Sequence, residues 1–389
     1  MMQEEFESKL LSIPQNVLNT EERDGRNPLG WRGQFTPELV QAYLEILPHD
    51  SPTIYDPFCG SGTVLMESAR KGFEAIGLEV NPAACILSRS YLCTSMADVE
   101  REELCNQISS WTESVCNQVG DSAWDESIGA VAERVIDSGD SVKDYLKSTM
   151  LISSKIRGNS STKLRRGSNR ICKLIRELPH SNKRVEVLLC DARFSPIESD
   201  SVDFVFTSPP YINVFNYHQQ YRAEVESLGH EVLVNAKSEI GSNRKHRSNR
   251  LKTVVQYCLD MEIILNELHR VMKSDGIAVF VVGRESNVRK TAFLNSELIE
   301  KIATQCCNFE ILGIRERYYV NRYGEKIYED ILHLKLIDQA PLDNQITTLS
   351  IAIEALTKAL GEATEDDIIM DLEEVIRLAD EILPSPPLA

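Results

Sequence analysis

The stretch TIYDPFCGSGTVLMESARKGFEAIGLE (53–79) decides how this chain folds. A short β-prone run (53–58) leads into a loop with two glycines, and a second run (74–79) follows after one helix length. Gly60 and Gly62 permit a tight turn and a close approach of the backbone to a ligand. The amino terminus of the helix that follows favours an anionic group. The stretch therefore predicts a strand, a binding loop, a helix and a second strand.

Further β-prone runs follow along the chain, and helical periodicity fills most of the gaps between them. The runs are VEVLLC (185–190), VDFVFT (202–207), IAVFVV (277–282), FEILGI (309–314) and ILHLKL (331–336). Strands that alternate with helices predict an α/β fold with a doubly wound, mostly parallel sheet. No obvious crossover helix joins the last two runs, so we expect them to form a hairpin. The prediction is a seven-stranded sheet with one antiparallel strand.

Two segments interrupt this alternation, the helix-prone segment 98–183 and the basic segment 222–258, and we expect both to be insertions at the edges of the sheet. Binding functions tend to accumulate in such segments. The end of the chain is acidic, with apolar residues at helical spacing. We therefore predict an N-terminal leader (1–26), a catalytic domain (27–337) that carries both insertions, and an acidic helical tail (338–389).

The charge of the chain is strongly segregated. The formal net charge is -17, yet residues 155–184 contain ten Lys/Arg and one Glu, and residues 237–252 contain six and one. Basic segments on an acidic protein are typical of a face that binds a polyanion. The alternative is two solvated basic loops without a partner.

The cysteines and the apolar content exclude several protein classes. None of the ten cysteines forms C-x-x-C, and the seven histidines do not cluster near them, which argues against a structural zinc site and a disulfide framework. We expect reduced, mostly buried thiols and no metal. Nothing approaches ~18 uninterrupted apolar residues, and the amino terminus lacks the basic start and apolar core of a signal peptide. We expect a cytoplasmic protein without a membrane partner.

Acidic residues follow two of the predicted strands. Glu79 ends the second strand about twenty residues after the glycine loop, where a ribose diol can be held. Asp191 follows the third strand, where its carboxylate can accept from an adenine amino group. Leu65 stands where a dinucleotide motif has its third glycine, which disfavours a pyrophosphate ligand. A ligand with ribose and adenine but no phosphate fits, as in S-adenosylmethionine. Alternatively, Glu79 is a solvated acid at the end of a strand, and Asp191 forms a turn before Arg193. For Asp191 considered by itself, the turn is the favoured interpretation.

The apolar run at 202–207 ends abruptly in a loop with two prolines and no glycine. Such a loop is stiff and offers a hydroxyl, carbonyls and an aromatic ring, but few N–H donors. A nucleobase amino group is a poor nucleophile and needs acceptors that hold its two N–H groups. The Ser208 hydroxyl and the Pro209 carbonyl can be these acceptors. Pro210 adds no competing donor, and Tyr211 can stack on a base that has left the duplex.

Together these motifs resemble the S-adenosylmethionine-dependent DNA methyltransferases that modify exocyclic amino groups, in their TSPPY form. The residues that carry the resemblance are DPFCGSGT (56–63), Glu79 with Asn81-Pro82, FTSPPY (206–211), RGQFTP (32–37) and HRVMKSDGIAVFVV (269–282). The resemblance covers residues 27–337 without the two insertions, and it implies a Rossmann-like methyltransferase sheet.

The resemblance also implies a role for individual residues. The residues implied in cofactor binding are Phe35, Thr36, Pro37, Asp56, Phe58, Gly60, Gly62, Glu79 and Asp191. Thr36 is alternatively a plain helix cap. The residues implied in catalysis are Ser208, Pro209, Pro210 and Tyr211. The candidates for DNA contact are Arg165, Arg166, Arg170, Asn213, Tyr217, Arg244 and Lys245.

The implied activity is methyl transfer to N4 of cytosine in double-stranded DNA, within a restriction-modification system. A restriction endonuclease is then a second candidate partner. The alternatives are an N6-adenine enzyme, an RNA or protein methyltransferase, and a non-catalytic DNA-binding subunit. RNA and protein enzymes more often have Asn or Asp before the two prolines, and the intact loop argues against a non-catalytic subunit. Cytosine-C5 methylation requires a Pro-Cys dipeptide, which does not occur in the chain.

Overall fold

A computed structural model of the chain describes most of the 389 residues. The described ranges are 2–21, 29–47, 52–119, 141–154, 160–212, 217–242, 246, 248–321, 323–337 and 347–388.

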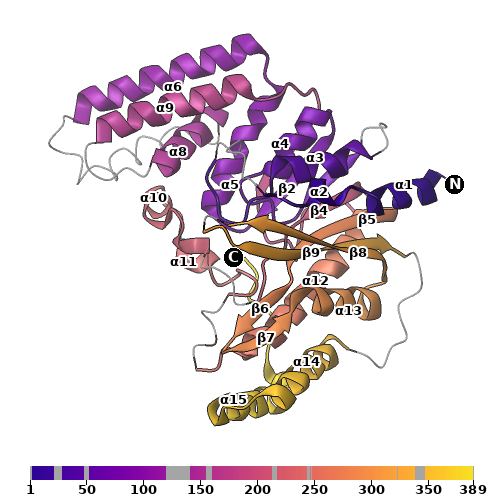
Figure 1. The fold of residues 1–389 in the computed structure, drawn as a ribbon. Helices are drawn as coiled ribbons and strands as arrows, with labels where there is room; N and C mark the ends of the chain where they lie inside the picture. Colours follow the sequence, from indigo (N-terminus) through magenta and orange to yellow (C-terminus); the bar gives the residue numbers. More distant parts are fainter. Residues whose placement is uncertain are drawn as a thin grey trace.

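A seven-stranded sheet forms the centre of the molecule (Figure 1). In spatial order its strands are β3 (Val185–Leu189), β2 (Glu74–Glu79), β1 (Thr53–Asp56), β4 (Val202–Thr207), β5 (Met272–Gly283), β9 (Lys326–Leu336) and β8 (Phe309–Val320). Strand β9 is antiparallel to both of its neighbours, and every other pairing in this sheet is parallel. The predicted doubly wound sheet with one antiparallel strand is confirmed, and so is the hairpin of the last two strands.

Helices cover both faces of the sheet. One face carries α1 (Met2–Leu11), α2 (Gln15–Leu18), α3 (Pro37–Glu45), α4 (Thr63–Lys71) and α5 (Pro82–Ser88), and the other carries α12 (Lys252–Val271) and α13 (Asn295–Cys306). Alternate strand residues point to opposite faces, so that Phe204 packs with the first group of helices and Val205 with the second. Because both faces are covered, the strands read as nearly continuous apolar runs.

The order of the strands places the carboxyl ends of β1 and β4 side by side. The chain passes from β1 outward to β2 and β3, then returns to β4 on the other side of β1. In open α/β sheets, ligands bind where the strand order reverses in this way. The loops after these four strands therefore gather at the edge where a site is expected.

The described parts of the segment 98–183 form a helical unit at the upper left of Figure 1. Its helices are α6 (Asp98–Val119), α8 (Val142–Ser154) and α9 (Ser160–Glu177), preceded by the 3-10 helix η1 (Arg89–Ser95). Apolar residues from all three helices, among them Ile108, Leu146 and Ile171, belong to one core that also includes Ile86 and Leu87 of α5. The described part of the predicted insertion therefore packs on α5 and shares a core with it.

One buried arginine joins the two ends of this unit. Arg101, on α6, is 1% exposed and donates to the carbonyl oxygens of Cys93 (3.1 Å) and Thr94 (3.1 Å) before the unit. Its guanidinium also donates to carbonyl oxygens at the far end of the unit: Ile175 (3.4 Å), Leu178 (2.6 Å) and Pro179 (2.8 Å). The two ends are thus fixed beside each other.

The second predicted insertion is shorter than expected. It contains α10 (Arg222–Ser227) and α11 (Val232–Asn235), after the 3-10 helix η2 (Tyr217–Gln219). Residues 252–258 do not belong to it, because α12 begins at Lys252 and its first turns are already buried in the main core. The boundary at 258 is corrected accordingly.

The segment 1–26 is not a separate leader in its described part. Leu10 and Leu18 are fully buried against the sheet, and Thr20 forms a bridge with Tyr319 of β8. Residues 2–21 therefore pack as part of the same unit as the sheet.

A small hairpin was not expected from the sequence. Strands β6 (Glu285–Val288) and β7 (Thr291–Leu294) pair through a turn at Arg289 and Lys290, which have φ of 51° and 66°. Turns of this kind normally use Asn or Gly. The dipeptide Arg289-Lys290 in the sequence therefore did not indicate a hairpin turn.

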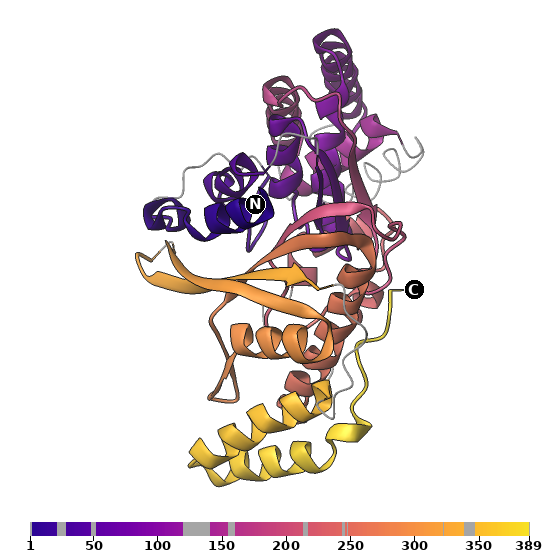
Figure 2. The same ribbon diagram turned by 90° about the vertical axis from the view of Figure 1, so that its right-hand side faces the viewer.

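The tail is helical, as predicted. It contains α14 (Thr348–Glu362), α15 (Asp366–Arg377) and the 3-10 helix η3 (Ala379–Glu381). The two α-helices lie together at the bottom of Figure 2, and the chain then runs back toward the sheet. In the described part of the chain, no helix has both the length and the apolar character needed to cross a membrane.

Candidate active site

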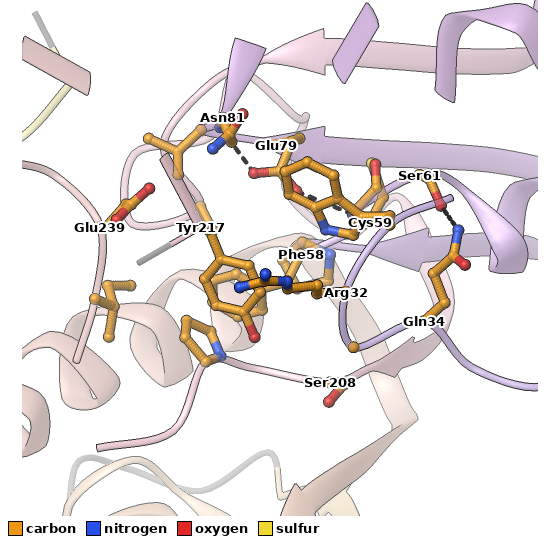
Figure 3. Close-up of a pocket in the computed structure, with 18 of the residues that line it drawn as sticks. Arg32, Gln34, Phe58, Cys59, Ser61, Glu79, Asn81, Ser208, Tyr217 and Glu239 are labelled. Carbon is orange, nitrogen blue, oxygen red and sulfur yellow. Dashed lines mark hydrogen bonds between the residues drawn. The ribbon is translucent and has the colours of Figure 1, made fainter. Parts of the chain in front are cut away.

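A cavity lies at the carboxyl ends of the parallel strands (Figure 3). Its floor is formed by the loop after β1 (57–61), the end of β2 (79–81), the turn after β3 (190–192), and Ser208 and Pro210 after β4. Residues 31–35, Tyr217 and the loop 238–240 complete its walls. Glu79 and Ser208 lie on opposite sides, with Tyr217 and Phe58 between them. The structure thus brings the glycine loop and the proline loop to one site.

The glycine loop adopts a conformation that requires its glycines. Gly60 and Gly62 have φ of 52° and 84°. A Cβ on Gly62 would lie 2.9 Å from the ring of Tyr91, and one on Gly60 would lie 3.2 Å from Trp31. Gly60 lines the cavity, whereas Gly62 caps α4 beneath it.

Glu79 anchors the loop and also faces the cavity. Its Oε2 accepts from the backbone N–H of Gly60 (3.0 Å), and its Oε1 accepts from that of Asn81 (2.8 Å). Burial raises the pKa of Glu79 to about 7, although the two backbone N–H groups oppose the shift. A carboxylate has about four lone-pair sites, and these two bonds use half of them. Acceptor capacity therefore remains for a ligand hydroxyl.

Asp56 lies beneath the cavity. It is 1% exposed, and its Oδ1 accepts from Thr207 Oγ1 (2.6 Å) and from the backbone N–H of Phe58 (3.1 Å). Burial raises the pKa of Asp56 to about 7. Its carboxylate ties the end of β1 to the end of β4 and so fixes the position of Phe58, which does line the cavity.

Asp191 lines the cavity, but its carboxylate is engaged by the protein. Arg193 donates to it through the backbone N–H (3.1 Å), Nε (2.9 Å) and Nη2 (2.6 Å). The backbone N–H of Leu388 adds a fourth bond at 3.2 Å. Arg193 also pairs with the buried Asp260 (2.6 Å) and donates to the carbonyl of Ser385 (2.6 Å). The end of the tail is thereby attached next to the cavity, and Asp191 also makes the turn that its position before Arg193 predicted.

The last three residues of the RGQFTP motif (35–37) contribute only the first of them to the cavity. Phe35 lines it, with its ring 5.1 Å from that of Phe206. Thr36 occupies the N-cap position of α3 and Pro37 the first helical position, as the alternative for Thr36 predicted. The Thr36 hydroxyl makes no capping bond and lies 3.3 Å from the Thr20 hydroxyl instead.

In the proline loop, Ser208 and Pro210 line the cavity, Pro209 is buried, and Tyr211 points away. The Tyr211 ring packs on Gly283, where a Cβ would lie 2.8 Å from it. Its hydroxyl donates to Glu329 Oε1 (3.1 Å). The proposed stacking of Tyr211 on a base would require it to leave this position.

Several lining residues were not predicted. Trp31 stacks on Tyr217 with ring centroids 6.2 Å apart, and it covers the glycine loop. Glu239 lines the opposite wall and is paired with the buried His218 at 2.9 Å. Trp31 and Arg32 stand beside or within the RGQFTP motif, which could have identified them. Glu239 stands alone in a basic run, and nothing in its sequence context indicated a site.

The predicted DNA contacts are not gathered at the cavity. Arg165 pairs with Glu113 of α6 (2.8 Å), and Arg170 donates to the carbonyl of Ser153 (2.8 Å). Arg166 is exposed on the same helix, α9. Tyr217 is the one candidate of the described set that lines the cavity. The other candidates, Asn213, Arg244 and Lys245, lie outside the described residues.

All ten cysteines are free, and all but Cys190 and Cys306 are buried, as predicted. Among the residues that the structure describes, no three His, Cys, Asp or Glu side chains are grouped in a way that could hold a metal ion.

Comparison with known proteins gives short matches in sequence. Two type II methyltransferases are each similar to the chain over a short stretch. M.MjaII of Methanocaldococcus jannaschii is 34% identical over 58 residues, and M.MvaI of Kocuria varians is 33% identical over 75 residues. These matches cover 15% and 18% of the chain, and the chain spans 11% and 16% of the two relatives. No family model matches the chain.

The solved structures that are similar to the chain are distant. One is a SAM-dependent methyltransferase from Methanosarcina mazei, which has 14% sequence identity and a TM-score of 0.34, with 75% of this chain and 95% of that chain covered. TrmN from Thermus thermophilus has 13% identity and a TM-score of 0.32, with 80% and 52% covered. The fold assignment made above rests on the sheet itself.

Proposed function

We propose that this chain is an S-adenosylmethionine-dependent methyltransferase that modifies N4 of cytosine in DNA. The observation that carries the proposal is a cavity in which Glu79, at the end of β2, lies across from Ser208, after β4. An acceptor for a ribose and an acceptor for an amino group thus lie across from each other. The short matches to type II methyltransferases support the same class of reaction.

The residues around the glycine loop fit the cofactor. Glu79 retains acceptor capacity for the ribose hydroxyls, and Gly60 leaves room that a Cβ would restrict. Phe58 and Trp31 supply apolar surface next to them. Asp191 lines the cavity at the adenine end, held in place by Arg193. When bound, the cofactor supplies an electrophilic methyl group on its sulfonium.

The proline loop supplies what the target amine lacks. An exocyclic amine must present its nitrogen lone pair, which is delocalised into the ring of the base. The Ser208 hydroxyl and the Pro209 carbonyl accept from its two N–H groups and favour the tetrahedral geometry needed for attack. The buried Thr207 and Pro209 fix the loop on either side of Ser208. An acceptor that is in place before the reaction lowers the barrier, and Ser208 lines the cavity.

The choice of base rests on the spelling Thr-Ser-Pro-Pro-Tyr, which the resemblance associates more often with cytosine than with adenine. Double-stranded DNA is the proposed partner. We assign the exposed basic side chains of α9, such as Arg166, and the segment 237–252 to its backbone. Within a restriction-modification system, an endonuclease would read the same site.

The proposal is tested by incubating the protein with DNA and S-adenosylmethionine, digesting the DNA to nucleosides and separating them by mass spectrometry. N4-methylcytosine is the expected product. N6-methyladenine as the sole product would change the assigned base, and the absence of any methylated nucleoside over DNA of varied sequence would overturn the proposed function.

Replacing Glu79 with alanine should weaken S-adenosylmethionine binding at least about tenfold, or about 1.4 kcal/mol. The change removes the proposed ribose acceptor and the anchor of Gly60. Glu74→Ala, at the other end of the same strand, is the matched control and should keep the wild-type affinity. Calorimetry on folded variants measures both, and equal affinities of Glu79→Ala and wild type would contradict the assignment.

A further inference from the structure

A line of polar side chains connects the proline loop to the last strand of the sheet. The Tyr211 hydroxyl lies 3.5 Å from Ser208 Oγ and donates to Glu329 Oε1 of β9 at 3.1 Å. The other oxygen of this carboxylate lies 3.5 Å from Arg317 Nε of β8. Arg317 and Glu329 are largely buried, with side chains 3% and 12% exposed. The line therefore runs from the cavity into the protein.

The chemistry of these groups gives the line a direction. An ionised carboxylate only accepts hydrogen bonds, and a phenol has one hydrogen to donate. Burial and the neighbouring Glu329 raise the pKa of Tyr211 well above its usual value, so the phenol keeps its proton. Because the phenol hydrogen is used in the hydrogen bond to Glu329, the Tyr211 oxygen can only accept a further hydrogen bond. The one hydrogen of the Ser208 hydroxyl is then drawn toward Tyr211.

This direction matters for the target amine. A serine hydroxyl can donate or accept, but only an acceptor holds an amine N–H. A hydroxyl whose hydrogen is directed at Tyr211 presents its lone pairs to the cavity. The Ser208–Tyr211 separation is long for a hydrogen bond, and such contacts commonly shorten when substrate binds.

We propose that Glu329 is a positioning residue for methyl transfer, acting through Tyr211 to hold the Ser208 hydroxyl as a hydrogen-bond acceptor. The inference rests on the function proposed above and assigns a residue far from the proline loop in sequence to the same reaction. Glu329 is not part of the cavity wall, so its effect on the amine passes through Tyr211. The charge of Arg317 compensates the carboxylate in its buried position.

The test uses Glu329→Gln, which keeps the shape of the side chain. Its amide can donate to the Tyr211 oxygen, which turns the phenol hydrogen toward Ser208 and occupies the serine lone pairs. We expect the single-turnover rate of methyl transfer to fall at least about tenfold, with the KM for DNA and the affinity for S-adenosylmethionine unchanged. Glu316→Gln is the matched control, because Glu316 lies on the same hairpin and pairs with Arg284 instead.

A double-mutant cycle with Tyr211→Phe decides whether Glu329 acts through the phenol. Once the hydroxyl is absent, adding Glu329→Gln should change the rate by less than about twofold. A full additional loss in the Tyr211→Phe background, or a wild-type rate for Glu329→Gln, would overturn the inference. If Glu329→Gln does not fold, a wild-type rate for Tyr211→Phe alone overturns it, and a reduced rate supports it. A wild-type protein that methylates no DNA would instead overturn the proposed function.

Discussion

Replacing Ser208 with alanine should lower the rate of methyl transfer to DNA by about 100-fold or more. The change removes one of the two acceptors that hold the target amine, and this interaction strengthens as the nitrogen becomes tetrahedral. Removal of one group that stabilises a transition state in a buried site typically has an effect of this size. Single-turnover measurements with saturating cofactor report the rate directly.

The affinity for S-adenosylmethionine should be unchanged in Ser208→Ala, since Glu79 and the glycine loop lie on the other side of the cavity. Ser201→Ala is the matched control. Ser201 immediately precedes the same strand at its opposite end, and its hydroxyl donates to the Glu198 carbonyl. A Ser208→Ala protein with a wild-type rate would show that the amine is held by other groups.

Replacing Arg101 with alanine should lower the free energy of unfolding by about 3 kcal/mol or more. The guanidinium donates to five carbonyl oxygens. Those of Cys93 and Thr94 also accept from backbone N–H groups, so the cost falls on the other three, which lose the Arg101 donor. Each unsatisfied buried group costs about 1–3 kcal/mol, less where water enters the space. Denaturant unfolding, followed by circular dichroism, measures the change.

Arg176→Ala is the control for this prediction. Arg176 joins α9 to α6 through Glu102, but both side chains are about half exposed. Exposed pairs of this kind contribute about 1 kcal/mol or less. Equal destabilisation by the two substitutions would mean that the carbonyl contacts of Arg101 contribute little.

The sheet could be predicted because its strands obey local rules. Strands β2 and β4 begin and end where their β-prone runs do. Ser201 and Ser208 bound β4 directly, and Gly72 and Asn81 stand one residue beyond the two ends of β2. The hairpin of β6 and β7 could not be predicted, because its turn residues Arg289 and Lys290 have positive φ, which residues other than Gly, Asn and Asp seldom adopt. The start of α12 was also missed, since basic residues precede it and no capping residue marks Lys252.

The sequence predicted which loops form the site, but it did not predict the orientations of several side chains in them. Motif spacing identified the residues around Glu79 and Ser208, because a parallel sheet brings strand ends together. The orientation of Tyr211 depends on the missing side chain of Gly283 and on Glu329, 118 residues further along the chain. The engagement of Asp191 by the end of the tail depends on a contact across 197 residues. No local pattern encodes contacts of this kind.

The contacts of Arg101 have a consequence for how the helical unit can be removed. The chain leaves the sheet near Thr94 and returns to it near Pro179, and Arg101 holds these two points together with the backbone N–H of Ser181, which donates to the Thr94 carbonyl (3.0 Å). The unit is also fastened to α5, where Thr149 donates to the Ile86 carbonyl (3.0 Å) and the two helices share an apolar core. Deleting the unit would therefore uncover apolar side chains of α5 as well as remove three helices.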